Sequence, residues 1–455
     1  MSKRYGRSIF CVPYSEMNTT QPKLTLIATK AREQPKLVFT SLMHLLTPEY
    51  LLDCFHELKK HKAPGVDTRT VESYDETEIQ AALQNLVSEL KSHRYRPQAL
   101  RRVLIPKANG KTRPLGIPTV IDKTLQLAVA KILERLYEPL FLNLSYGFRS
   151  KRNAHEALKA VNHMVMGRQV NWIIDADIQG FFDNVNHDWM MKCLKQRISD
   201  PHMLSLIQRF LKAGVMTQGT IKATTQGTPQ GGIVSPTLAN IYLHYVLDLW
   251  FNVKERHEVH GYSQLIRYAD DFVIGVQTKK DAQKVQEDMR KRLAKFGLTF
   301  AQDKTRILEF GRFAATNIVA RGGSKPNTFD FLGFTHYCSK THDGRFSLKV
   351  KTSRKKYAAS LASMNVWLKT VRSILTLPDL WNILASKLRG HYQYYGVSGN
   401  FEGIRQFYDQ TEQLTFKWTN RRSQKASWNW TMWREHLKKY PLPKPKLTYA
   451  FYNTW

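Results

Sequence analysis

The 455-residue chain contains few cysteines, and they are not spaced as metal or disulfide sites require. Cys11, Cys54, Cys193 and Cys338 lie far apart, and no Cys-x-x-Cys pair or Cys/His cluster occurs. This spacing excludes a zinc finger and a disulfide framework. We expect reduced thiols in the protein core.

Long apolar runs are also missing. No segment approaches the ~18 apolar residues that a membrane helix needs, and the first ten residues are too polar for a secretory signal. We therefore expect no membrane span and a cytoplasmic location. Internal repeats and low-complexity linkers are absent from the sequence as well, so the domain boundaries must come from the positions of motifs.

Acidic residues are scarce relative to basic ones. The sequence has 37 Asp and Glu against 69 Lys and Arg, which gives a formal net charge of +32. This excess opposes compaction unless a polyanion neutralises it, so nucleic acid is the expected partner. The length and the 42% hydrophobic content indicate a globular protein of two or three domains rather than a disordered chain.

Two adjacent acids, Asp270 and Asp271, stand in the segment RYADDFVIGV between apolar runs that predict strands. Neighbouring carboxylates in a tight turn repel each other unless a cation lies between them, so the pair indicates a divalent metal site. A solvated hairpin turn is the alternative interpretation, because aspartate is common in such turns.

A third acid, Asp177, comes at the end of a predicted strand in NWIIDADIQGFFDNV. Two metal ions about 4 Å apart, bridged by carboxylates from separate strands, support in-line phosphoryl transfer. Asp177, Asp270 and Asp271 are candidates for this arrangement. Asp175 and Asp183 compete with Asp177, but one lies two residues earlier and the other follows the predicted end of the strand.

A basic hairpin is predicted in RRVLIPKANGKTRPLGIP, residues 101–118, where an Asn-Gly pair favours a tight turn between two extended runs. A proline in each run cannot donate to a ladder, so we expect both strands at a sheet edge. Lys107 and Arg113 would then suit a triphosphate, as a point charge and a bidentate fork. A solvated basic hairpin is the alternative.

Helices and further strands follow from periodicity and breakers. Apolar residues at helical spacing predict helices over about 47–62, 76–93, 123–141, 153–165, 189–197, 203–213 and 279–296. Residues 227–235, GTPQGGIVS, predict a glycine-rich bend in which Gln230 could contact a base or sugar edge, with Ser235 and Pro236 capping a helix. Residues 298–310 and 329–334 predict sheet elements, and a separate helical domain starts near Ser353.

These motifs, taken in order, resemble the bacterial group II intron reverse transcriptase and maturase family. The resemblance rests on KAPGVD, IPKANGKTRPLGIP, SYGFRS, DIQGFFDNV, GTPQGGIVSPTLANIYL, YADD, FDFLGF and LRGHYQYYGVSGN, which run from residue 62 to residue 400. It implies an α+β right-hand polymerase: an N-terminal extension in 1–46, fingers and palm in 47–350, and an α-helical thumb with maturase domain X in 351–455.

The resemblance also implies roles for single residues. Asp177, Asp270 and Asp271 would hold two Mg²⁺, with the backbone carbonyl of Ile178 as a further ligand. The nucleotide would be contacted by Lys107 and Arg113 at the triphosphate, by Phe182 at the position that rejects a 2′-hydroxyl and so favours deoxynucleotides, and by Gln230.

The implied partners are an RNA template, a DNA primer, deoxynucleoside triphosphates and group II intron RNA. Basic residues of domain X would contact the intron RNA: Arg389, Arg421, Arg422 and Lys425. Helical-core packing is the expected role for most of the aromatic residues there, and residues 441–447, PLPKPKL, are expected to form an extended closing segment.

Many relatives continue into an HNH endonuclease with paired cysteines, which this sequence does not show. We therefore expect no cleavage of its own target strand and priming from DNA ends made elsewhere. Three alternatives remain open: a host-adopted relative acting in phage defence or DNA repair, a splicing factor with an inactive polymerase, and an RNA replicase. Ala269 before the acid pair favours an intron-associated member, the complete set of acids argues against inactivity, and Phe182 argues against a replicase.

Overall fold

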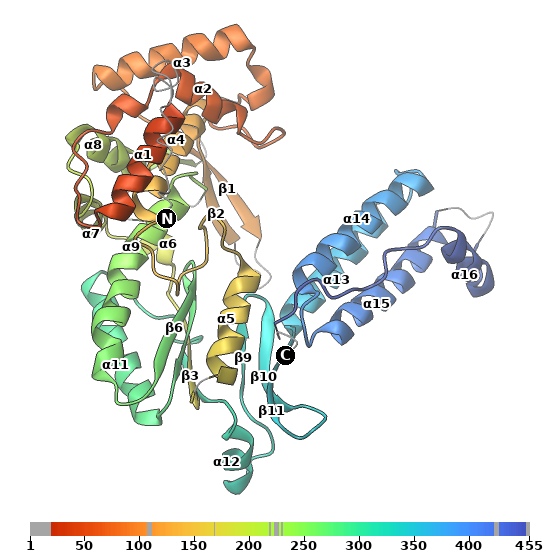
Figure 1. The fold of residues 1–455 in the computed structure, drawn as a ribbon. Helices are drawn as coiled ribbons and strands as arrows, with labels where there is room; N and C mark the ends of the chain where they lie inside the picture. The colour runs from red at the N-terminus through yellow and green to blue at the C-terminus, as the bar shows by residue number, and fades with distance from the viewer. Residues whose placement is uncertain are drawn as a thin grey trace, which may run out of the picture. The chain divides into compact units, whose positions relative to one another are not determined.

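The structure is a computed structural model that describes residues 20–106, 112–167, 169–217, 220–222, 227–228, 231–422 and 427–451 (Figure 1). Lys107, Gln230 and Lys425, named from the sequence, lie outside the described residues. The chain divides into two compact units. Unit 1 comprises the described parts of 1–151, 178–254 and 288–300, and unit 2 comprises those of 152–177, 255–287 and 301–455.

Unit 1 is built mainly from helices. Its elements outside the sheet are α1 (Thr20–Glu33), η2 (Met43–Leu45), α2 (Pro48–His56), η3 (Val71–Ser73), α3 (Glu76–Lys91), α4 (Val120–Tyr137), α6 (Phe181–Asn184), α7 (His187–Lys195), α8 (Pro201–Lys212), α9 (Ser235–Leu243) and the π-helical turn η4 (His244–Asp248). The predicted cap of α2 is confirmed, because the Thr47 side chain accepts from the N–H of Tyr50 at 3.2 Å. That helix ends at His56, earlier than predicted.

The sheet of unit 1 has the strand order β2-β1-β4-β5. The predicted hairpin forms β1 (Leu100–Pro106) and β2 (Thr112–Ile117), which pair antiparallel. The prediction that both strands lie at an edge is wrong for β1, which also pairs with β4 (Val215–Thr217), itself antiparallel to β5 (Thr220–Lys222). This second pairing involves the start of β1, at Leu100 and Arg101, and therefore leaves the proline at the other end unopposed by β4.

The helix after the glycine-rich bend begins one residue differently from the prediction. Val234 is the N-cap of α9, and Ser235 is already the first helical residue, with Pro236 behind it. Proline is tolerated there because the first N–H groups of a helix have no partner within it.

The main sheet of unit 2 has the order β6-β7-β3-β8, and its pairings are antiparallel. Its strands are β3 (Trp172–Asp177), β6 (Ser263–Tyr268), β7 (Asp271–Val276) and β8 (Arg306–Glu309). Ile174 and Ile274 lie opposite each other in the buried centre. The helix α5 (Ala154–Gly167) contacts this sheet closely, since a Cβ on Gly275 would lie 2.8 Å from the Met164 sulfur.

A second sheet of unit 2 has the order β11-β10-β9, made by β9 (Thr328–Phe331), β10 (Phe334–Lys340) and β11 (Phe346–Thr352). The chain then becomes helical, with α13 (Arg354–Val371), α14 (Leu377–Tyr395), α15 (Phe401–Thr419) and α16 (Trp430–Lys439). The remaining elements of unit 2 include α10 (Arg256–Glu258) and α12 (Ala314–Ala320), while η5 (Phe251–Glu255) and α11 (Lys279–Lys295) have residues in both units.

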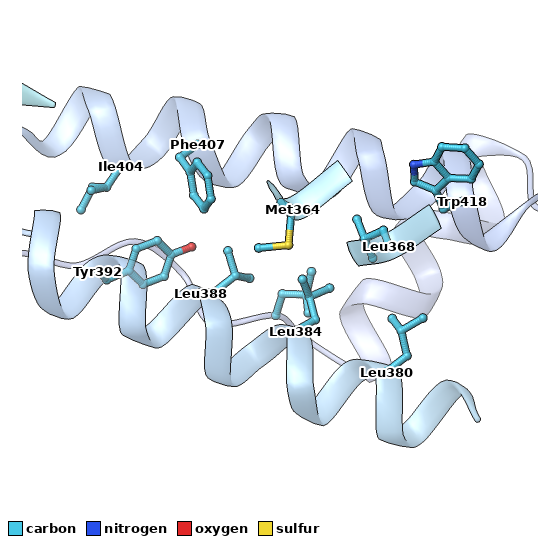
Figure 2. Close-up of a cluster of buried hydrophobic side chains, with 10 residues drawn as sticks. Met364, Leu368, Leu380, Leu384, Leu388, Tyr392, Ile404, Phe407 and Trp418 are labelled. Atoms are coloured by element: carbon cyan, nitrogen blue, oxygen red, sulfur yellow. The ribbon is translucent and has the colours of Figure 1, made fainter. Parts of the chain in front are cut away.

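Helices α13, α14 and α15 enclose an apolar core. Figure 2 shows side chains from the three helices pointing toward one another, including Leu368, Leu384 and Phe407. Tyr392 belongs to this core and Trp433 is fully buried, which confirms core packing for these two aromatic residues. Burial on this scale is the main source of stability for helices that would be marginal alone.

The C-terminal segment, predicted to be extended over residues 441–447, leads to residues that contact the end of α14. Residues 441–447 have no regular secondary structure, and the N–H of Thr448 donates to the Gly396 carbonyl at 2.6 Å. Tyr449 forms a bridge with Val397, and its ring stacks on His155 at 3.8 Å between centroids. In the part of the chain that is described, no helix combines the length and the apolar character needed to traverse a bilayer.

Candidate active site

Two of the candidate acids are opposite each other in unit 2. Asp177 is the last residue of β3 and pairs in register with Asp271, the first residue of β7. Residues directly opposite in an antiparallel pair point to the same face, so the two carboxylates share one face at one end of the sheet. The backbone carbonyl of Asp177 accepts from the N–H of Ala301 at 2.8 Å, which anchors this end of the strand.

The third acid lies in the turn between β6 and β7. Ala269 has a left-handed backbone with φ of 57°, and Asp270 follows it. A left-handed alanine costs about 1–3 kcal/mol. The fully buried Arg267 donates to the Ala269 carbonyl at 2.9 Å and thereby stabilises the strained turn. The fold thus brings the three predicted acids to the same end of one sheet.

The electrostatics of this cluster show mutual repulsion. The pKa of Asp271 is raised to about 7, first by burial and then by the charges of Asp177, Asp175 and Asp270. A backbone hydrogen bond from Leu332 acts in the opposite direction and lowers the pKa. Three carboxylates whose charges disfavour one another are a donor set that a divalent cation stabilises.

Lys304 supplies a cation to the cluster. Its ammonium group donates to the Asp177 carboxylate, and its pKa is raised, first by that hydrogen bond and then by the charge of Asp177. Among the described residues, the three acids do not bring one carboxylate oxygen each within 4.8 Å of the other two. In this arrangement the Asp177 carboxylate is instead engaged by the Lys304 ammonium group.

The two competing acids have other surroundings. Asp175 shares the face of Asp177 but lies two residues, or about 6–7 Å, further back along β3. Its carboxylate pairs with Arg306 at 2.9 Å, and burial raises its pKa. Asp183 lies in the short helix α6 of unit 1 and is exposed. Asp177 is therefore the acid of this segment that lies opposite Asp271.

Ile178, the predicted carbonyl ligand, follows directly after the last residue of β3. Its side chain is buried, and it forms an isolated antiparallel bridge with Phe300 within unit 1. The neighbouring Gln179 N–H donates to the Thr299 carbonyl at 2.9 Å. The backbone at Ile178 is therefore held by the segment that precedes Ala301.

Support for Asp271 comes from a turn that the sequence did not assign to the site. Leu332 and Gly333, in FDFLGF, both have left-handed backbones, and the Leu332 N–H bonds to the Asp271 carboxylate. The Tyr394 hydroxyl of α14 donates to the Leu332 carbonyl at 2.9 Å. The sequence marked both segments by the glycine-containing motifs FDFLGF and LRGHYQYYGVSGN. No feature within either motif indicates that the two contact each other.

In unit 1, the glycine-rich bend packs against the residues around Phe182. The Phe182 carbonyl accepts from the Thr228 N–H at 2.7 Å, and the Gly227 N–H donates to the Val185 carbonyl at 2.8 Å. Gly227 has a φ of 88°, and a Cβ there would lie 2.9 Å from the Phe182 carbonyl oxygen. Glycine is required because the two segments touch through their backbones.

The same bend also contacts the strand that carries Arg113. Gly231 has a φ of 110°, and a Cβ there would lie 2.7 Å from the carbonyl oxygen of Gly116, three residues after Arg113 on β2. Arg113 itself is exposed, opposite Ile105 of β1. Unit 1 therefore assembles Arg113, Phe182 and both flanks of the bend that contains Gln230.

The basic residues predicted to contact intron RNA differ in their surroundings. Arg389 is exposed on α14. Arg421 is also exposed, and its guanidinium lies 5.2 Å from the centre of the Trp418 ring. Arg422 is partly buried and donates to the Leu375 carbonyl at 2.9 Å, which ties the end of α15 to the connection between α13 and α14. Arg422 thus has a structural role in holding the chain, whereas the Arg389 side chain is exposed to solvent.

The geometry in unit 2, with carboxylates from two neighbouring antiparallel strands at one end of a sheet, is compatible with a nucleotidyl-transfer class of site. The comparisons agree with this class. A family model described as reverse transcriptase (RNA-dependent DNA polymerase) matches residues 105–336. The group II intron-encoded protein LtrA of Lactococcus lactis subsp. cremoris is 31% identical over 466 residues, covering 86% of this chain and 76% of that protein.

Two further relatives extend the comparison. Protein YkfC of Escherichia coli (strain K12) is 35% identical over 316 residues, covering 62% of this chain and 82% of YkfC. The putative COX1/OXI3 intron 1 protein of Saccharomyces cerevisiae is 28% identical over 388 residues, covering 74% of this chain and 43% of that protein. The chain belongs to the group II intron-encoded reverse transcriptases, which makes it an RNA-directed DNA polymerase with a divalent metal cofactor.

Proposed function

We propose that this polymerase extends a DNA primer on an RNA template with Asp177, Asp270 and Asp271 as the ligands of two Mg²⁺ ions, and that it also binds group II intron RNA to assist splicing. The observation that carries the proposal is the pairing of Asp177 with Asp271 in register, with Asp270 next in the chain. The raised pKa of Asp271 supports a site that is completed by cations.

The reaction is attack of the primer 3′-hydroxyl on the α-phosphate of a deoxynucleotide, which forms one phosphodiester bond and releases pyrophosphate. Bound divalent ions would lower the pKa of the attacking hydroxyl and neutralise charge on the departing pyrophosphate. The carboxylates of the three aspartates would bind these ions, and the backbone carbonyl of Ile178, next to Asp177, would be a further ligand.

The residues of unit 1 position the nucleotide. Arg113 and Lys107 bind the triphosphate through charge-assisted hydrogen bonds, and Gln230 packs by the incoming nucleotide. Phe182 discriminates against the 2′-hydroxyl of ribonucleotides. Its carbonyl accepts from the Thr228 N–H, which fixes the backbone that carries the ring.

The domains of the polymerase follow one another along the sequence. Fingers and palm occupy residues 47–350, preceded by an extension in 1–46, and the thumb with domain X occupies 351–455. The change from strand to helix between Thr352 and Arg354 supports the second boundary. Of the basic residues named in domain X, Arg389, Arg421 and Lys425 contact intron RNA, whereas Arg422 has a structural role through its hydrogen bond to the Leu375 carbonyl.

Primer extension on an RNA template tests the proposal. Asp177→Asn should lower the rate of deoxynucleotide incorporation by at least about 100-fold, because the amide lacks the charge that holds the cations. The matched control is Asp183→Asn, which changes an exposed acid six residues away and should extend primers at nearly the parent rate. Efficient synthesis by folded, RNA-binding Asp177→Asn would refute the assignment, as would incorporation of ribonucleotides at rates near those of deoxynucleotides.

A further inference from the structure

One exposed ring stands out in the loop that connects α4 to α5. In the motif SYGFRS, Ser145, Gly147 and Arg149 are buried, whereas the side chain of Phe148 is 51% exposed. Phe148 also has a left-handed backbone, with φ of 56°. A bulky residue in this region is strained, and such strain persists only where the surroundings enforce it.

The surroundings enforce it through two buried side chains of unit 1. Asn240 of α9, which is 1% exposed, donates through Nδ2 to the Gly147 carbonyl at 2.7 Å and to the Phe148 carbonyl at 3.4 Å. Arg149 donates through Nη1 to the carbonyls of Leu142 and Ser145, both at 2.7 Å. It also pairs with Glu138 at 2.8 Å.

The loop is thus pinned on both sides of Phe148 while the ring itself stays half in solvent. Core packing does not explain a phenylalanine at this position, and glycine would suit the backbone better. A single ring between buried neighbours is also too small for a protein–protein interface, which needs roughly 1,000 Å² or more. One ring is sufficient for a different ligand, because stacking on one unpaired base needs only one aromatic face.

The neighbouring charge fits the same ligand. Lys151, three residues further on, is also exposed and also has a left-handed backbone, with φ of 60°. An ammonium group three residues after an exposed ring in the same loop suits a nucleotide, which joins a flat base to an anionic phosphate. The net charge of +32 makes nucleic acid the available partner for such a site.

We propose that Phe148 is a stacking platform for an unpaired base of the bound nucleic acid, with Lys151 contacting a phosphate next to that base. This inference rests on the proposed function, since it assumes that the protein holds single-stranded template or structured RNA. It adds a contact outside the acids and the nucleotide-binding residues. The base could belong to the template strand or to an unpaired loop of intron RNA, and both present the same chemistry.

The test uses the full chain and fluorescent aminopurine in place of one adenine, because stacking on an aromatic ring quenches its emission. One probe is a DNA primer on an RNA template with a single-stranded overhang, and the other is an RNA hairpin with an unpaired loop. Phe148→Gly removes the ring and relieves the backbone strain, so a purely structural role predicts an equal or higher melting temperature and unchanged binding. The stacking role predicts about 5- to 100-fold weaker binding and loss of quenching on at least one probe.

Two further variants separate ring shape from apolar area. Phe148→Trp should bind as tightly as the parent protein. Phe148→Leu should show the same weaker binding and loss of quenching as Phe148→Gly. If the glycine variant is unstable, these two variants still test whether the ring stacks on a base. The matched control is Phe313→Leu, which removes another exposed phenylalanine, 55% exposed in unit 2, and should change neither affinity nor quenching. Unchanged binding and quenching on both probes in Phe148→Gly or Phe148→Leu would overturn the inference.

The outcome is separable from that of the proposed function. Binding and quenching are measured without catalysis, so a parent protein that binds RNA but does not extend primers would refute the polymerase proposal alone. A parent protein that extends primers, together with Phe148 variants that bind and quench normally, would refute the stacking platform alone.

Discussion

At the scale of single residues, backbone contact determines residue type in the glycine-rich bend of unit 1. Gly227 has a positive φ, and its missing side chain leaves room for the carbonyl oxygens of Asp183 and Phe182, 2.8 and 2.9 Å from where a Cβ would be. The glycine-rich bend is therefore in direct backbone contact with Phe182. A shift of the bend would therefore move the backbone that carries the Phe182 ring.

Gly227→Ala should consequently destabilise unit 1 by about 2–4 kcal/mol, because positive φ and atomic overlap add. The variant should also discriminate less well between deoxynucleotides and ribonucleotides, since the Phe182 backbone must move. Denaturant unfolding measures the first effect, and primer extension with each nucleotide class measures the second.

Gly344 provides the control, since it also has a positive φ of 76° but has no atom within 4 Å of a Cβ built on it. Gly344→Ala should cost only about 1 kcal/mol and leave selectivity unchanged. Equal costs for the two substitutions would mean that the contact with Phe182 contributes nothing.

At the scale of elements, α14 is connected to the acid cluster through one turn. Tyr394 bonds to the Leu332 carbonyl at 2.9 Å, and the Leu332 N–H bonds to Asp271. The helix of the predicted thumb and domain X region thus positions the turn that orients an acid on β7. Tyr394 acts through Leu332 and is a positioning residue.

Tyr394→Phe should lower kcat by about 2- to 10-fold, the effect of losing one neutral hydrogen bond. Affinity for the primer and template should stay the same, because the hydroxyl already has its partner within the protein. The control is Tyr395→Phe, which removes the same group from the adjacent ring, also packed on Phe334 at 5.3 Å between centroids. A loss of template affinity instead of kcat would show that Tyr394 contacts nucleic acid.

Elements with a strong local signal could be predicted, and contacts between distant elements could not. The strand that ends at Asp177, the turn at Asp270 and the hairpin that carries Arg113 follow from alternation, apolar runs and turn residues. Pairing of β1 with β4 escaped prediction because the partners are more than 100 residues apart and only Leu100 and Arg101 take part. The ion pair of Lys304 with Asp177 escaped it for the same reason, because the partners are 127 positions apart in the sequence.

At the scale of the whole molecule, the excess of basic residues has to be divided between binding and structure. Arg389 and Arg422 illustrate the two uses. Arg389 is exposed on α14, whereas Arg422 is partly buried and bonds to the Leu375 carbonyl. Each contributes one of the 69 basic side chains, so net charge alone does not distinguish a binding role from a structural one.

The salt dependence of RNA binding separates the two uses. Each phosphate contact releases counterions, so the logarithm of the affinity should fall linearly with the logarithm of salt concentration, with a slope of about −4 or steeper if about six phosphates are contacted on a single strand. Arg389→Ala should make this slope shallower by about 0.7, the share of one phosphate contact.

Arg422→Ala should leave the salt slope unchanged and instead lower the melting temperature, because the Leu375 carbonyl and the connection between α13 and α14 lose their donor. Binding titrations at several salt concentrations and a thermal melt of each variant measure the two effects. An unchanged slope in Arg389→Ala would exclude its contact with phosphate. A shallower slope in Arg422→Ala, without loss of stability, would show that its guanidinium leaves the Leu375 carbonyl to bind RNA. Basic residues that are hydrogen-bonded within the folded chain would then also contribute to RNA binding.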